Sequence, residues 1–322
     1  MVHDIEMKKQ NQRAILLLDN GENEQAEKVF CNNYRKFPCL ITSINYAYFL
    51  LDEHYSAKKL LFLGAFLRKK KIKHLLYSNE NQTMDNKTKY HVECLKGRYD
   101  FEDFRLKKAK MHFEFALRIN PASIEAVTLL AWISFLEHDP AESLAYLDKL
   151  SALLQLGDHF HDNLEILFEN CPFIRFPYYQ LRAITLYEAG LTNSAFDLID
   201  AICESTLSSK DALFPMTEIM LVCLHLHRDY WLKPIVEKIK QDTSAYTDNE
   251  MNSVIFLLLR ESKTREELKF LSRRLWRETS FYSKLFFTVR SLLLNKPRRA
   301  FQQVPLSYKD CQFLECPIHD RS

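Results

Sequence analysis

The stretch KAKMHFEFALRINPAS, residues 108–123, sets small and apolar residues at helical spacing and ends at Asn-Pro. Ala109, Phe113 and Ala116 recur at intervals of four and three, which places them on one face of a helix. Pro121 stops that helix, because proline lacks the N–H that continues the hydrogen-bond ladder. A second helix-like run follows at once. A pair of short helices buries its apolar faces only when similar pairs stack on it, so the stretch predicts a repeat protein.

The same spacing of small and bulky residues recurs elsewhere in the chain. It is found in three further sets: Ala26, Phe30, Asn33 and Pro38; Ser143, Leu147 and Leu150; and Ala195, Ile199 and Ile202. Ala109 and Ser143 lie 34 positions apart, whereas Ala57 precedes Ala109 by 52 positions. Ser143 precedes Ala195 by 52 as well. Each longer step equals one period plus 18 residues, which predicts insertions near 72–89 and 157–174.

Paired helices with this period resemble the tetratricopeptide repeat family. That family places a small residue at the eighth position of each unit and a glycine in the turn. The matching residues are Ala14, Gly97, Ala131 and Ala183 for the small position, and Gly21 and Gly190 for the turn. The resemblance implies an all-α, right-handed α-solenoid of about 6–8 stacked antiparallel helix pairs. It covers residues 1–206 with the two insertions; residues 207–305 are predicted as degenerate helical repeats and 306–322 as a C-terminal tail.

Composition supports this class. The 322 residues include only five glycines, too few for a β-sandwich or for glycine-rich phosphate loops. Lys and Arg nearly balance Asp and Glu, at a net charge of +2, so the chain as a whole shows no electrostatic preference for nucleic acid or anionic membranes.

The start is polar, and the longest uncharged apolar run, AVTLLAWISFL, is about half a membrane span. Eight scattered cysteines indicate a reducing compartment. We expect a cytoplasmic protein without membrane insertion, with the nucleus as the alternative in a eukaryote.

No constellation of residues predicts catalysis, so we expect a protein that is not an enzyme and needs no cofactor or metal. Phosphate loops, dinucleotide fingerprints and nucleophile elbows are lacking in the sequence. Two His-x-His pairs, His159 with His161 and His225 with His227, point to different sides of a helix and indicate ordinary histidines. The ending CQFLECPIH offers a zinc site three soft ligands but no fourth: Cys311, Cys316 and His319.

The family resemblance also implies a concave groove lined by the first helix of each unit, which holds a peptide or helix of another protein. The groove positions correspond here to an aromatic set with one arginine: Tyr46, Phe49, Arg98, Phe101, Trp132, Phe135 and Tyr187. Aromatic anchors with arginine are typical of binding hot spots and favour an apolar or amphipathic ligand. The alternative is that these rings pack against the chain's own insertions or C-terminal third. A carboxylate clamp for chaperone C-termini is not predicted, because Asn11, Ile15 and Ser43 occupy its positions.

Two basic segments leave a nucleic-acid function open. Residues 68–74, RKKKIKH, end an amphipathic helix and indicate a solvated helix end, or else an import signal or an acidic partner's site. Residues 263–299 contain 11 Lys and Arg against three Asp and Glu, interleaved with aromatic residues. We expect an outward basic face there: Arg273, Arg274, Arg277, Lys296 and Arg298.

The predicted function is therefore a non-enzymatic scaffold, adaptor or chaperone-like subunit that binds an apolar or helical segment of another protein. The alternative is a nucleic-acid-associated regulator acting through residues 263–299.

Overall fold

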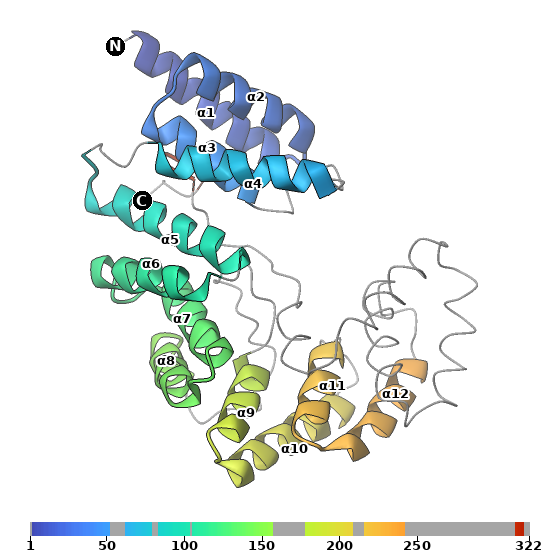
Figure 1. Ribbon diagram of the computed structural model, residues 1–322. Coiled ribbons are helices and arrows are strands. Elements are labelled where there is room, and N and C mark those ends of the chain that lie inside the picture. Colours follow the sequence, from blue (N-terminus) through green and yellow to red (C-terminus); the bar gives the residue numbers. More distant parts are fainter. Residues whose placement is uncertain are drawn as a thin grey trace. The chain divides into compact units, whose positions relative to one another are not determined.

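The computed structural model describes residues 2–51, 62–78, 83–103, 105–156, 178–208, 216–241 and 313–318. The regular structure within these ranges is entirely helical (Figure 1). The α-helices are α1 (Val2–Asp19), α2 (Asn23–Lys36), α3 (Leu40–Leu51), α4 (Phe62–Tyr77), α5 (Asn86–Glu102), α6 (Leu106–Ile119), α7 (Ile124–Leu136), α8 (Pro140–Leu153), α9 (Tyr178–Glu188), α10 (Thr192–Ser208), α11 (Met216–His225) and α12 (Leu232–Gln241). A single-turn 3₁₀ helix, η3 (Asp229–Trp231), precedes α12.

The described helices belong to two compact units. The first contains α1 to α6, α7 up to Ile133, and the C-terminal residues 313–318. The second contains the rest of α7, from Ser134, and α8 to α12. Within each unit consecutive helices pack as pairs and each pair packs on the next, as in α1 with α2, α2 with α3, or α9 with α10. The fold is an α-solenoid of stacked antiparallel helix pairs, as the sequence period predicts.

Local chain geometry explains why one helix ends near Pro121 and another begins. Helix α6 ends at Ile119, and the backbone of Asn120 is extended, as a residue before proline prefers. The Ser123 hydroxyl then accepts a hydrogen bond from the Ala126 N–H at 3.1 Å, which caps the start of α7. The apolar face predicted for α6, Ala109, Phe113 and Ala116, is fully buried.

Small residues allow the paired helices to approach closely. Gly97 on α5 lies against the Phe113 ring of α6, and a Cβ atom at this position would stand only 2.8 Å from that ring. The two predicted turn glycines, Gly21 and Gly190, have φ of +78° and +79°, in the left-handed region that glycine tolerates best. Their turns end α1 and α9 with reverse hydrogen bonds, for example from the Glu22 N–H to the Leu17 carbonyl at 2.8 Å.

Helices α4 and α5 occupy much of the region predicted as the first insertion, 72–89. The basic run 68–74 lies within α4, which continues to Tyr77. Helix α5 begins at Asn86, and its preceding residue Asp85 accepts a hydrogen bond from the Thr88 N–H at 2.8 Å. The second insertion, 157–174, lies outside the described residues.

In the second unit, polar side chains join the successive helices. Tyr178 on α9 donates to the Leu147 carbonyl of α8 at 3.2 Å. His225 on α11 lies 2.9 Å from the Glu188 carboxylate of α9. Among the described helices, none is both long enough and apolar enough to cross a membrane. Of the stretch 207–305 predicted as degenerate repeats, the described part contains α11, η3 and α12.

Candidate functional site

Residues 313–318, Phe-Leu-Glu-Cys-Pro-Ile, form a short non-helical segment that packs on the first three helices (Figure 1). We call it the tail segment. The side chains that hold it come from α1, α2 and α3, and together they are called the tail site: Lys8, Asn11, Phe30, Asn45 and Tyr48. The contact joins residues from opposite ends of the sequence within one compact unit.

Two asparagine side chains bind the tail backbone at Leu314. The Asn45 amide accepts a hydrogen bond from the Leu314 N–H at 2.7 Å and donates one to the Leu314 carbonyl at 2.9 Å. Asn11 donates a second bond to the same carbonyl at 3.3 Å. Both amides are fully buried, so the loss of these partners would leave polar groups unpaired away from water, at a cost of about 1–3 kcal/mol. Hydrogen bonds to main-chain atoms bind an extended peptide whatever its side chains are.

The Phe313 ring fills an aromatic position between α2 and α3. It stacks on Phe30, with ring centroids 5.5 Å apart and planes 9° apart, and it meets Tyr48 at 4.1 Å. Phe30 also contacts Phe49, with ring centroids 5.5 Å apart. Phe313 is buried, and burial of such a ring contributes about 1.5–3 kcal/mol. The aromatic contact thus fixes the residue immediately before the backbone bonds.

A charged contact follows the backbone bonds on the other side. The Lys8 ammonium lies 2.9 Å from the Glu315 carboxylate, at the solvent-exposed rim. The hydrogen bond from Lys8 to Glu315 raises the pKa of the lysine above its ordinary value. Glu315 has a φ of +54°, a left-handed conformation that a glutamate rarely adopts. Beyond it, the Cys316 side chain is buried.

The predicted aromatic set divides by exposure. Tyr46, Phe49, Trp132, Phe135 and Arg98 are buried, and the other two, Phe101 and Tyr187, are half-buried. A buried ring contacts a partner only after whatever covers it has moved.

Several of these residues have defined neighbours. Lys71 of α4 binds the Tyr46 hydroxyl and stands 4.2 Å from the centre of its ring. The Arg98 guanidinium lies over the Tyr48 ring, 5.5 Å from its centre, and 4.0 Å from the Glu125 carboxylate. These contacts connect the predicted residues to the packing of the first unit.

Tyr187 has its neighbours in the second unit. Its ring approaches Phe196 at 6.1 Å, His225 at 6.0 Å and His227 at 6.5 Å between centroids. The two histidines of the HLH stretch therefore surround an aromatic ring.

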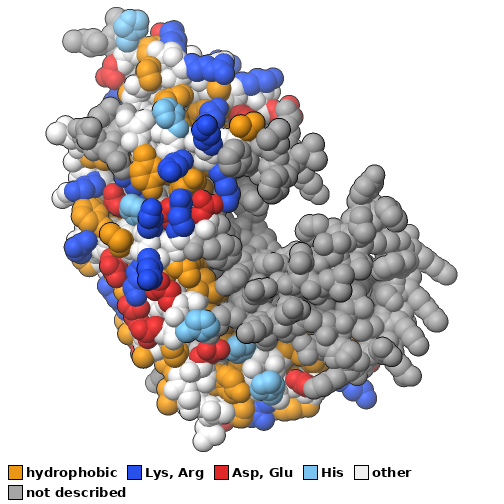
Figure 2. All heavy atoms as spheres, in the orientation of Figure 1, with side chains coloured by type: hydrophobic (Ala, Val, Ile, Leu, Met, Phe, Trp, Pro, Cys, Tyr) orange, Lys and Arg blue, Asp and Glu red, His pale blue; other side chains and the backbone are white. Residues whose placement is uncertain are grey.

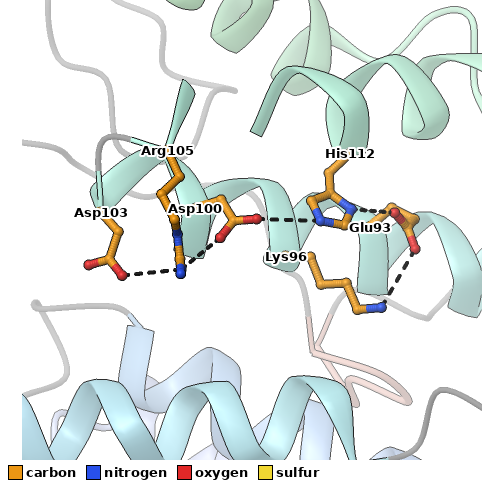
Figure 3. A network of polar contacts seen from close by, with 6 residues as sticks. All are labelled: Glu93, Lys96, Asp100, Asp103, Arg105 and His112. Carbon is orange, nitrogen blue, oxygen red and sulfur yellow. Dashed lines mark hydrogen bonds and ion pairs between the residues drawn. The ribbon is translucent and has the colours of Figure 1, made fainter. Parts of the chain in front are cut away.

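A polar network joins α5 to α6 (Figure 3). The His112 ring of α6 bridges two carboxylates of α5, with Nδ1 2.7 Å from Glu93 and Nε2 3.5 Å from Asp100. Arg105 extends the network, 2.7 Å from Asp100 and 3.1 Å from Asp103. The contacts between His112 and the two carboxylates fasten α6 to α5.

Other predicted elements are only partly described. The basic face Arg273, Arg274, Arg277, Lys296 and Arg298 lies outside the described residues, as do Cys311, His319, His159 and His161. No group of three His, Cys, Asp or Glu side chains within the described ranges is arranged to hold a metal ion. On the described surface in Figure 2, basic side chains lie among acidic and hydrophobic ones.

The tail site is not predicted from the sequence. Asn11 stands out only as a residue that does not suit a carboxylate clamp, and no motif includes Asn45. The repeat pattern does not pair the two asparagines, because they lie 34 positions apart whereas the equivalent residues Ala26 and Ala57 of the first two units lie 31 apart. The one local signal is that Asn45 is a polar residue within the apolar run INYAYFLL. Its partner, Leu314, has no comparable signal.

Comparison with known proteins adds a fold-level similarity. The sequence matches no protein-family model and no curated protein sequence. Among solved structures, the chain is similar to the apo form of RapI, with a TM-score of 0.47 and 11% sequence identity. The similarity covers 92% of this chain and 84% of the RapI chain.

Proposed function

We propose that this chain is a tetratricopeptide-like interaction scaffold that binds a short segment of another protein at the tail site. The observation that carries the proposal is the two-point hydrogen bond between the Asn45 amide and the Leu314 backbone. A side-chain amide has one acceptor and two donors, so it pairs with a peptide unit much as a neighbouring strand does. Helix surfaces rarely offer that pairing, because their own backbone groups are already used.

The tail site combines three kinds of recognition on one rigid support. Asn11 and Asn45 bind main chain, Phe30 and Tyr48 accept an aromatic ring, and Lys8 attracts a carboxylate. The supporting side chains lie on helices that pack directly on one another. Preformed sites lose little conformational entropy when a ligand binds, which favours a short peptide as the ligand.

Two members of the predicted aromatic set are not fully buried: Phe101 on α5 in the first unit and Tyr187 on α9 in the second. We propose that each provides an apolar contact for a partner bound to its own unit. The five buried members support the helices that carry these contacts.

Affinity capture from the native source tests this function with a matched pair of variants. Asn45→Ala removes two of the three side-chain hydrogen bonds to the backbone of residue 314. Asn33→Ala removes a buried amide of the same first unit, which donates to the Met7 carbonyl at 3.1 Å and does not touch the tail segment. The proposal predicts proteins that the unaltered chain and Asn33→Ala retain and that Asn45→Ala loses, and that bind again as purified proteins.

Two results would contradict the proposal. One is that the same proteins are retained whether or not Asn45 is present. The other is that Asn33→Ala and Asn45→Ala lose them equally, in which case general stability rather than the tail site governs binding.

A further inference from the structure

We propose that the partner segment has the chemistry of the tail segment, an aromatic residue, then an apolar residue, then a carboxylate at a turn, and that it binds by displacing the tail. This inference rests on the proposed function and names both the class of partner and the regulation of its site. The occupant seen in the structure shows what the site accepts, because every recognised feature of the tail has a matching group on α1, α2 or α3.

The order of the three features follows from the geometry. Asn45 fixes the N–H and the carbonyl of Leu314. The aromatic ring must therefore belong to the preceding residue, whose side chain contacts Phe30 and Tyr48. The carboxylate must belong to the following residue, whose side chain contacts Lys8. A segment with the acid first and the ring last would place a carboxylate against aromatic faces and a ring at the charged rim.

The side chain of the middle residue must be apolar, because Leu314 is buried with only 7% of its surface exposed. Its backbone rather than its side chain is bound by Asn45, so other apolar residues of similar size fit the same position. The pattern thus specifies a class of segments instead of one sequence.

The tail segment leaves one hydrogen-bonding atom of the tail site unpaired and adopts a strained backbone conformation. Asn45 uses its donor and its acceptor on Leu314, whereas Asn11 donates only, and its Oδ1 atom has no hydrogen-bond partner among the described residues. Glu315 also holds a left-handed φ of +54° to reach Lys8. A partner that supplies one more N–H to Asn11, or that reaches Lys8 without this backbone strain, would bind better than the tail.

Since the tail belongs to the same chain, its occupancy of the site does not fall on dilution. A partner competes with it, and the apparent dissociation constant equals the intrinsic one divided by the fraction of molecules whose site is open. A tail that occupies the site in more than nine-tenths of molecules weakens partner binding at least tenfold. Release of the tail is therefore the step that regulates the scaffold.

Fluorescence anisotropy with a labelled synthetic peptide of residues 309–322, KDCQFLECPIHDRS, tests the inference under reducing conditions. The peptide is titrated into the full chain and into full-length Phe313→Asp, whose own tail cannot place a charged side chain against Phe30. The same titration is made with full-length Leu314→Pro, whose tail is released for a different reason, because proline lacks the N–H that Asn45 binds. We expect at least tenfold tighter binding to both variants than to the unaltered chain.

Specificity is measured in the same assay. Adding Asn45→Ala to Phe313→Asp should abolish binding, while adding Asn33→Ala should preserve it. A peptide with alanine in place of its phenylalanine, or with its phenylalanine and its glutamate exchanged, should bind at least tenfold more weakly. Equal affinity of the unaltered chain and both tail variants, or binding that persists without Asn45, would overturn the inference.

The remaining outcomes separate the inference from the proposed function. If Asn45-dependent proteins are captured but tail release does not strengthen peptide binding, the scaffold function stands and the inference fails. If the peptide binds as expected but no captured protein depends on Asn45, the tail contact serves the chain alone and the proposed function fails. A concentration-dependent dimer of the unaltered chain in sedimentation, lost in Phe313→Asp, would make a second copy the occupant and overturn the inference.

Discussion

Asn45 binds the backbone of Leu314 through both ends of its side-chain amide, although the two residues are 269 positions apart in the sequence. The bond therefore joins the start and the end of the chain within the first compact unit. Closing a loop of this length costs chain entropy, which the contacts of the tail segment must offset.

Asn45→Ala should release the tail segment. The substitution removes two hydrogen bonds and leaves the buried Leu314 N–H unpaired, at a cost of about 1–3 kcal/mol, while the Leu314 carbonyl keeps its bond from Asn11. Hydrogen exchange of the Leu314 amide should then accelerate by about one to two orders of magnitude. Asn33→Ala is the control, since it alters a comparable buried amide on α2 but should leave the Leu314 amide protected. Unchanged protection in Asn45→Ala would show that the bond does not hold the tail.

Reversal of the charge at Lys8 should loosen the tail, and a second reversal should restore it. Lys8→Glu places like charges together, whereas Lys8→Glu with Glu315→Lys rebuilds the ion pair in the opposite sense. Lys8 is 45% exposed, so the change in tail occupancy should stay within about fivefold and shrink at high salt. Since the pKa of Lys8 is raised, the contact persists at neutral pH, and on the alkaline side it is lost as pH rises through that raised pKa. Peptide competition measures the effect, and failure of the double variant to recover would contradict the pairing.

Two glycine substitutions should destabilise the first unit for different reasons. Gly97→Ala places a Cβ atom 2.8 Å from the Phe113 ring, so it should lower the free energy of unfolding by about 1–3 kcal/mol through overpacking. Gly21→Ala meets no atom within 4 Å, and its cost of about 1–2 kcal/mol comes from φ of +78° alone. Denaturant titration measures both. Pairing each alanine with Phe113→Leu should recover stability only for Gly97→Ala, and recovery in both would refute the steric explanation.

The reactivity of the described cysteines should follow their burial. The Cys203 and Cys223 sulfur atoms lie 3.6 Å apart, and both thiols are free and buried. A hydrogen bond with Cys223 and burial raise the pKa of Cys203, so almost no thiolate forms at neutral pH. Iodoacetamide should alkylate the half-buried Cys31 and Cys39 well before Cys203 in the native chain. Mass spectrometry after short labelling times measures the order in which the cysteines are alkylated. Modification of Cys203 before Cys31 and Cys39 would contradict the prediction.

The repeat architecture could be predicted from the sequence because each helix repeats a local rule. The spacing of Ala109, Phe113 and Ala116 predicted one buried face, and the structure buries all three residues. Gly21 and Gly190 predicted left-handed turns, and both have a positive φ. These features depend on neighbours three to five positions away, where helical periodicity is informative.

The tail site could not be found in the same way, because its partners are distant and non-periodic. Phe313 carries an apolar side chain in a segment without helical spacing, and nothing local indicates that Phe30 and Tyr48 receive it. The aromatic groove set was chosen by position within the unit alone. Position does not reveal that Tyr46 is covered by Lys71, or that Arg98 lies over Tyr48 in the packed interior.

The most direct test of peptide binding at the tail site is a nuclear magnetic resonance titration of full-length Leu314→Pro labelled with ¹⁵N-asparagine. The unlabelled peptide of residues 309–322 is added, and the side-chain amide signals are followed. The account predicts that the signals of Asn11 and Asn45 shift together and saturate, while that of Asn33 stays in place. Saturable binding that leaves the Asn11 and Asn45 signals unchanged would contradict the claim that these side chains hold the peptide.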